Sequence, residues 1–284
     1  MTSSYLNGNY SVVIRETNNS LNSMIKTAFR INEELIGEFP DSIDLKISNK
    51  CFWGCPYCHE NSIANGKVFD LEKTKQILEQ LPKVPIEIAI GGGNVFESPE
   101  ETLELIRWLK QNNFRPRITI NWRDVIKRIF ATTSKTPKIH EILLELDTIG
   151  ISIDNSIDEL KQERLFTTYD NYIWGWDHDV TPQNNILKAY SDLTRVYHVI
   201  AGIIDINEFK RILEFSTKYF ISIRLLILGF KQFGRAKDMK LPDSIKELES
   251  IIKRYIYDCR IQNRHPANRV ILGFDNLAIE QLHI

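Results

Sequence analysis

Short apolar runs alternate with amphipathic stretches along most of this 284-residue chain, and this alternation constrains the fold more than any other feature. Runs such as 43–47 and 86–90 have the length of buried strands, whereas 71–81 places its apolar residues at helical spacing. Alternating strands and helices predict parallel strands joined by right-handed crossovers, in an open sheet or a barrel. In both architectures the chemistry lies at the carboxyl ends of the strands.

The expected elements follow from the same periodicity. We expect strands at 43–47, 86–90, 117–120, 149–153, 195–202 and 221–228, a seventh beginning at 269–272, and helices at 71–81, 98–112, 139–146, 157–165, 207–219 and 244–259. Asp70 is the expected N-cap of the first helix, and Ser98 with Glu101 predicts a capping box. The core domain is expected over 41–272, most strongly over 41–230. We expect residues 1–40 to form a lead-in with one helix over 21–35. We expect residues 273–284 to form a tail without a helix.

Composition places the chain among ordinary globular proteins. Hydrophobic residues make up 43% and charged residues 26%, and the formal net charge of −1 indicates neither nucleic acid nor a membrane as partner. No apolar run approaches the roughly 20 residues of a membrane span. The first ten residues also lack a signal-peptide core. We therefore expect a cytoplasmic protein whose four cysteines are thiols or metal ligands rather than disulfides.

Three cysteines crowd one loop directly after the first expected strand. Cys51, Cys55 and Cys58 have the spacing C-x3-C-x2-C. Thiolates are the usual ligands of iron–sulfur clusters. Three of them leave one iron of a 4Fe–4S cluster without a protein ligand, and an open position is what a catalytic metal centre needs. The aromatic neighbours expected to shield such a cluster from water are Phe52, Trp53 and Tyr57.

Two other interpretations of this loop remain open. Cys55-Pro-Tyr-Cys58 is also a dithiol redox motif, which leaves Cys51 without a role. Alternatively, the three cysteines and His59 could bind zinc in an interaction protein. The dithiol interpretation predicts that Cys51→Ala is tolerated, and the zinc interpretation predicts a colourless protein without turnover.

Small or polar residues follow several of the other strands. Gly91, Gly92 and Gly93 precede Asn94, and glycines let a backbone approach a ligand closely. Ser152 and Asp154 alternate to the same face of their strand. The other residues at strand ends that could contact a ligand are Asn121, Arg123, Leu228 and Phe230. Asn121 and Arg123 could bind a ribose or a carboxylate.

The cysteine spacing, together with Tyr57 before the last cysteine, resembles the radical S-adenosylmethionine superfamily. The resemblance implies a partial (βα)6 TIM-like barrel of parallel strands. It also implies that the open iron chelates S-adenosylmethionine, which is reductively cleaved to a 5′-deoxyadenosyl radical that abstracts hydrogen from a substrate. An external electron donor, a flavodoxin or a ferredoxin, is implied as well.

The resemblance also assigns cofactor contacts residue by residue. The cluster ligands are Cys51, Cys55 and Cys58, and the expected contacts to S-adenosylmethionine are Tyr57, Gly91, Gly92, Gly93, Asn94, Asn121, Ser152, Asp154 and Leu228. Asn94 departs from the acidic residue common in the family at that place, which leaves a charged contact to the ammonium group open.

The substrate is not named by the sequence. His59 could donate or accept a proton near neutral pH, or simply begin a helix. Lys231, Gln232 and Arg235 follow the sixth strand and could hold an anionic substrate, and Lys and Arg outnumber Asp and Glu over 207–269. Cys259 is expected to be a buried thiol. The aromatic segment 169–179 is either a lid or a packing insert.

Overall fold

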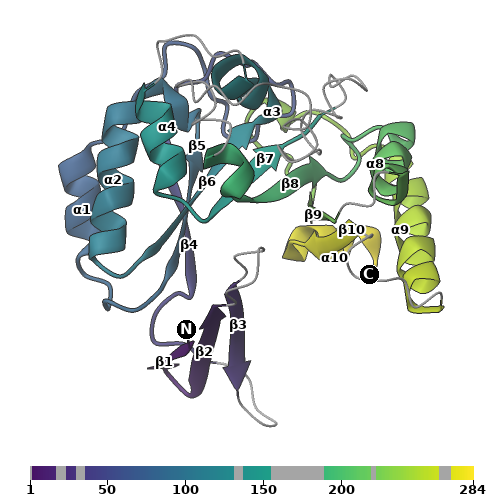
Figure 1. The fold of residues 1–284 in the computed structure, drawn as a ribbon. Helices are drawn as coiled ribbons and strands as arrows, with labels where there is room; N and C mark the ends of the chain where they lie inside the picture. The colour runs from purple at the N-terminus through teal and green to yellow at the C-terminus, as the bar shows by residue number, and fades with distance from the viewer. Residues whose placement is uncertain are drawn as a thin grey trace, which may run out of the picture.

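The computed structural model describes residues 2–16, 24–29, 36–130, 137–154, 189–218, 222–261 and 270–284. These residues form a large parallel sheet with helices packed along it and a small antiparallel sheet near the N-terminus (Figure 1). The expected helix at 157–165 and the aromatic segment 169–179 lie outside the described residues.

The large sheet has seven strands in the order β10-β9-β8-β7-β6-β5-β4, and every neighbouring pair is parallel. Sequential order with parallel pairing confirms the predicted partial TIM-like barrel. The edge strands β4 and β10 do not pair, so the sheet stays open. Its strands are β4 (Ser42–Ser48), β5 (Glu87–Gly92), β6 (Arg115–Asn121), β7 (Thr148–Ser152), β8 (Thr194–Ile200), β9 (Ile223–Leu228) and β10 (Val270–Phe274).

The two faces of this sheet differ in polarity. Side chains alternate between the faces along each strand. On β5, Ile88 is buried in the main core, whereas Glu87, Ala89 and Gly91 line a cavity on the opposite face. Parallel strands covered on both faces are usually apolar throughout. The polar inner face therefore indicates that the interior of the open barrel is a binding space rather than a second core.

Helices cover the apolar face. Figure 1 shows α1, α2 and α4 side by side along the β4–β6 half of the sheet, and α8 beside α9 at the other half. A π-helical turn, η2 (Val125–Phe130), continues the short helix that follows β6. The helices are α1 (Leu71–Leu78), α2 (Pro99–Gln111), α3 (Trp122–Asp124), α4 (Pro137–Leu144), α8 (Ile206–Lys218), α9 (Ser244–Ile261) and α10 (Asn276–Leu282), with 3-10 turns η1 (Val95–Glu97) and η3 (Gly234–Ala236).

The two predicted helix caps have opposite outcomes. Asp70 caps α1, because its carboxylate accepts a hydrogen bond of 3.0 Å from the backbone N–H of Lys73. The capping box at Ser98 was wrong. The chain enters α2 directly from turn η1, so the Ser98 side chain is buried and its hydroxyl has no hydrogen-bond partner among the described residues.

The helix predicted over 21–35 was also wrong. Met24–Phe29 forms strand β3, which pairs antiparallel with β2 (Tyr10–Glu16), and β2 pairs in turn with β1 (Thr2–Asn7). Strand pairing overrode local propensity here. The Tyr10 hydroxyl donates to Asp41 at 2.7 Å, and the Asn7 amide donates to the Phe39 carbonyl at 2.9 Å. These bonds tie the small sheet to the segment that enters β4.

A helix also follows the seventh strand, where none was expected. Asp275 caps α10 and accepts hydrogen bonds from the backbone N–H groups of Ala278, at 2.7 Å, and Gly229, at 2.9 Å. Gln281 accepts from the Phe230 N–H at 2.7 Å. Helix α10 thus supports the end of β9. The predicted division of the chain into lead-in, core and tail stays a prediction.

None of the helices in the described ranges has the length and apolarity to cross a membrane.

Candidate functional site

A cavity of about 900 Å³ lies on the polar face of the large sheet and reaches the carboxyl ends of its strands. Segments far apart in the sequence meet in its wall. Of the predicted site residues, Cys51, Cys55, Tyr57, Cys58, His59, Gly91, Gly92, Gly93, Asn94, Asn121, Ser152 and Leu228 line the cavity. Asp154 lies in the wall behind them, next to the lining residue Ile153.

The cysteine loop leaves β4 and is held by its own backbone. The Cys51 N–H donates to the Ile63 carbonyl at 2.9 Å, and the Cys58 N–H donates to the Cys55 carbonyl at 3.2 Å. All three thiols are free and partly buried. Burial raises the pKa of Cys51 and of Cys55. The Arg123 guanidinium, 4.0 Å from the Cys55 sulfur, acts against that rise and favours the thiolate.

Arg235 clamps this loop from the segment after β9. Its guanidinium donates to the Cys55 carbonyl at 2.8 Å and to the Ser62 carbonyl at 2.6 Å, while its backbone N–H donates to the Cys58 carbonyl at 3.0 Å. Gly234 has φ of +58°, and a Cβ there would overlap the His59 carbonyl. The loop and turn η3 therefore pack backbone against backbone.

These contacts correct the expected anion site after β9. The Arg235 guanidinium is occupied by loop carbonyls, and the Gln232 amide donates to the Met239 carbonyl at 2.8 Å. Of the three residues named, only Lys231 lines the cavity. Cys259, expected as a buried thiol, is only partly buried on α9 and does not line the cavity.

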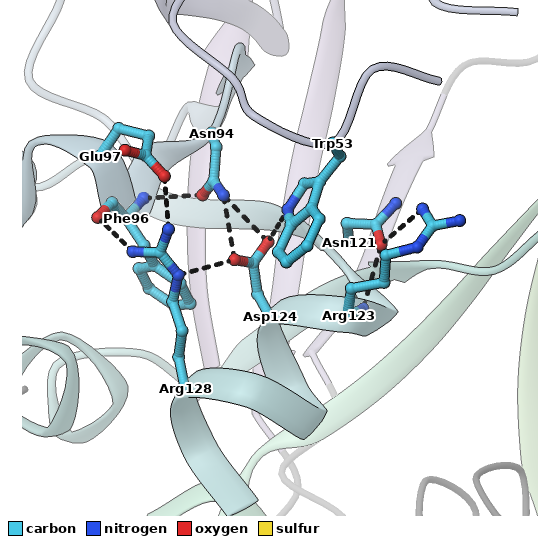
Figure 2. Close-up of polar contacts among 8 residues, drawn as sticks. All are labelled: Trp53, Asn94, Phe96, Glu97, Asn121, Arg123, Asp124 and Arg128. Atoms are coloured by element: carbon cyan, nitrogen blue, oxygen red, sulfur yellow. Dashed lines mark hydrogen bonds and ion pairs between the residues drawn. The ribbon is translucent and has the colours of Figure 1, made fainter. Parts of the chain in front are cut away.

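A buried carboxylate, Asp124, joins three segments of the site (Figure 2). It accepts hydrogen bonds of 2.9 Å from the Trp53 indole N–H and 2.9 Å from the Asn94 amide, and it forms an ion pair of 3.0 Å with Arg128. Its side chain is 1% exposed. Burial raises the pKa of Asp124, whereas the hydrogen bonds and Arg128 oppose the rise. Sequence reasoning missed this residue, because a lone aspartate after a strand carries no spacing signal.

The glycine turn rests on the start of the cysteine loop. The Gly93 N–H donates to the Ser48 carbonyl at 2.6 Å, and the Asn94 N–H donates to the Lys50 carbonyl at 2.8 Å. Gly92 has φ of +105°. A Cβ on Gly93 would overlap Lys50 backbone atoms, whereas a Cβ on Gly91 would meet nothing within 4 Å. Gly91 thus leaves open space at the cavity wall.

Asn94 has structural partners on both ends of its amide. Its oxygen accepts from the Phe96 N–H at 2.9 Å, which caps turn η1, and its NH2 group donates to Asp124. The predicted contact from Asn94 to S-adenosylmethionine stays a prediction, as do those from Asn121 and Ser152 at the ends of β6 and β7.

A second carboxylate, Asp154, gathers aromatic and basic donors. It accepts from the Tyr57 hydroxyl at 2.7 Å and from the Trp122 indole at 3.0 Å, and it forms an ion pair of 3.1 Å with Arg123. Burial, with the nearby Cys55 and Asp154, raises the pKa of Tyr57. Arg123 therefore pairs with protein groups, and Asp154 orients Tyr57 at the last turn of the cysteine loop.

His59 lines the cavity beside charged neighbours. Its Nε2 is 3.3 Å from a Glu60 carboxylate oxygen, and Glu60 is also paired with Lys46. Burial, with Lys231 nearby, lowers the pKa of His59. The catalytic role predicted for His59 stays a prediction.

The three thiols of the cysteine loop can be compared with the ligands that an iron–sulfur cluster needs. Within the described ranges, no three His, Cys, Asp or Glu side chains form a group suited to a single metal ion. The three thiols nevertheless line one cavity from one loop, and Gly91, where an added Cβ would meet nothing within 4 Å, lines the same cavity. Sulfur ligands with room for a further ligand fit an iron–sulfur cluster.

No protein-family model and no curated protein matches this chain. Among solved structures, Streptococcus suis SuiB bound to S-adenosylmethionine matches with a TM-score of 0.52 and 15% identity, over 85% of this chain and 52% of SuiB. SuiB bound to the precursor peptide SuiA matches with a TM-score of 0.54 and 15% identity, over 87% of this chain and 52% of SuiB. The chain has the fold of the radical S-adenosylmethionine superfamily. This radical S-adenosylmethionine fold confirms the predicted resemblance, although the chain spans only about half the length of SuiB.

Proposed function

We propose that this protein is a radical S-adenosylmethionine enzyme that holds a 4Fe–4S cluster on Cys51, Cys55 and Cys58. One observation carries the proposal: the three free thiols, the glycine turn and the strand ends line a single cavity. That cavity lies at the carboxyl edge of a parallel sheet, where this architecture places its chemistry.

The chain supplies binding and shielding, while the cofactors supply the bond cleavage. When bound and reduced, the cluster provides the electron that cleaves S-adenosylmethionine to methionine and a 5′-deoxyadenosyl radical. Cys51, Cys55 and Cys58 would hold the cluster, and the open space at Gly91 would receive the methionyl end. Further contacts along the cavity are provided by Tyr57, Gly92, Gly93, Asn94, Asn121, Ser152 and Leu228, with Asp154 acting through Tyr57.

The reducing electron comes from an external donor of the flavodoxin or ferredoxin class. The resulting radical would abstract hydrogen from a substrate in the same cavity, where the lining residue His59 is the candidate for proton transfer. The precursor peptide bound to SuiB makes a peptide one substrate class to test.

The deciding experiment measures 5′-deoxyadenosine by mass spectrometry. The protein is purified without oxygen, reconstituted with iron and sulfide, reduced with dithionite and given S-adenosylmethionine. We expect 5′-deoxyadenosine from the wild type and from Cys259→Ser, which lies outside the cavity, but not from Cys55→Ser.

Two outcomes would replace this proposal. A colourless protein that retains zinc and forms no 5′-deoxyadenosine would favour the zinc-binding interpretation. Thiol–disulfide exchange that survives in Cys51→Ala and is lost in Cys55→Ser would favour the dithiol interpretation.

A further inference from the structure

The interior of the open barrel carries polar groups below the cysteine loop. Arg224 on β9 and His198 on β8 line the same cavity as the three cysteines. In the sheet register, Arg224 lies opposite Val196, and His198 lies opposite Leu226 and Ser152. His198 is therefore one inward-facing layer nearer the strand ends than Arg224.

Arg224 differs from the other arginine that lines this cavity. Arg117 forms an ion pair of 2.8 Å with Glu87. Within the part of the chain that the structure describes, the Arg224 guanidinium has neither a hydrogen-bond nor an ion-pair partner. It is partly buried between strands, opposite Val196 and Ile271. Burial lowers the pKa of Arg224, and no carboxylate among the described residues compensates its charge.

An uncompensated guanidinium in a cavity is suited to an external anion. Arginine keeps its charge in proteins, and its flat array of N–H donors matches the two oxygens of a carboxylate. Removing a charge from water without a partner is costly, so a bound carboxylate would provide the interactions that the described residues do not offer Arg224.

His198 adds a neutral hydrogen-bonding group above this charge. A Cβ on Gly150 would lie 2.7 Å from the His198 Cε1, 2.9 Å from its Nε2 and 2.8 Å from the Thr119 hydroxyl oxygen. The absence of a side chain at Gly150 therefore makes room for the imidazole. Burial lowers the pKa of His198 to about 4, so the ring is neutral at pH 7, with one donor and one acceptor.

We propose that Arg224 binds a carboxylate of the substrate, and that His198 hydrogen-bonds a polar group next to it. This inference rests on the proposed function and names the substrate class as a carboxylic acid. From Arg224 to Leu228 the strand rises four residues, or about 13 Å at ~3.3 Å per residue. The carboxylate end thus lies deep in the barrel, with the reacting carbon nearer the cysteine loop.

The test is a calorimetric titration of the reconstituted 284-residue protein with small acids. N-acetyl-L-glutamate α-amide presents a side-chain carboxylate, N-acetylglycine a terminal carboxylate, and N-acetyl-L-glutamine amide neither. We expect an acid to bind about tenfold or more tightly than the neutral amide, as one charge-assisted contact implies. The acid that binds more tightly shows whether the substrate presents an acidic side chain or a carboxyl terminus to Arg224.

Matched variants locate the binding. Arg224→Gln should weaken binding of the acid by about tenfold or more, and Arg224→Lys should retain part of the affinity. Arg254→Gln on the exposed face of α9 should bind like the wild type. Circular dichroism melting confirms that each variant is folded.

Two results would overturn this assignment. The first is an acid affinity unchanged by Arg224→Gln and Arg224→Lys, and the second is the absence of saturable binding by either acid. Because no turnover is needed, the outcome is independent of 5′-deoxyadenosine formation. Arg224-dependent binding without 5′-deoxyadenosine would refute the radical chemistry alone, and the converse would refute only the carboxylate site.

Discussion

The Asp124 carboxylate accepts a 2.9 Å hydrogen bond from the indole N–H of Trp53, across a sequence separation of 71 residues. Trp53 lies between two of the cysteines, and Asp124 lies in the helical turn after β6 (Figure 2). Because Asp124 also accepts from Asn94, one buried carboxylate connects the cysteine loop to the glycine turn.

Removing this carboxylate should destabilise the protein substantially. Asp124→Ala leaves the Arg128 charge and the Trp53 and Asn94 donors without their acceptor, so the free energy of unfolding should fall by about 3–5 kcal/mol. Urea denaturation under anaerobic conditions measures the change. Asp258→Ala is the control, because its carboxylate is exposed and 3.9 Å from Arg254, and it should change stability by less than about 0.5 kcal/mol. Equal losses in both variants would contradict this role.

Single cysteine substitutions should separate the three interpretations of the loop. Replacing Cys51, Cys55 or Cys58 by serine should abolish cluster incorporation, because a thiolate is lost in each case. Cys259→Ser should incorporate iron and sulfide like the wild type, since Cys259 does not line the cavity. Iron and sulfide analysis with visible absorption after reconstitution provides the measurement. Full incorporation in Cys51→Ser would refute the three-cysteine assignment.

The glycine turn predicts two different consequences of adding one methyl group. Gly93→Ala should destabilise the fold by about 1–3 kcal/mol, because its Cβ would overlap the Lys50 backbone. Gly91→Ala should leave the melting temperature nearly unchanged, because its Cβ meets nothing within 4 Å, yet it should weaken S-adenosylmethionine binding. Thermal melting and calorimetric titration measure the two effects. If Gly91→Ala bound S-adenosylmethionine with wild-type affinity, the proposed contact between Gly91 and the methionyl end would be refuted.

His198 should make stability depend on pH in the mildly acidic range. Its pKa is about 4 in the folded protein and 6.5 as its ordinary value, so the unfolded chain binds the proton first as the pH falls. The contribution is fully present above about pH 6.5 and is lost towards pH 4, with a total of about 3 kcal/mol. Urea denaturation at several pH values, in the wild type and in His198→Asn, isolates this residue. If the free energy of unfolding changed with pH in the same way in the wild type and in His198→Asn, the prediction would be contradicted.

Local patterns in the sequence determined the strand–helix alternation, the cysteine loop and the Asp70 cap. Alternation with a period of two marks strands and helical spacing marks helices, and both depend only on near neighbours in the chain. The parallel order of the sheet followed from the same alternation, because short crossovers allow few topologies. Of the residues expected at strand ends, the glycine turn, Asn121, Ser152 and Leu228 therefore line one cavity, whereas Arg123 and Asp154 do not.

Tertiary structure decided the features that depend on distant partners. Met24–Phe29 forms a strand because β2 offers an edge to pair with. The Ser98 side chain does not cap α2, because the preceding turn buries it. Arg235 reaches the Cys55 carbonyl across 180 residues, and the space for His198 exists because Gly150 lies on the neighbouring strand. Such contacts depend on sheet register and on the path of loops through space. No local spacing encodes them, so only the folded chain brings these groups together.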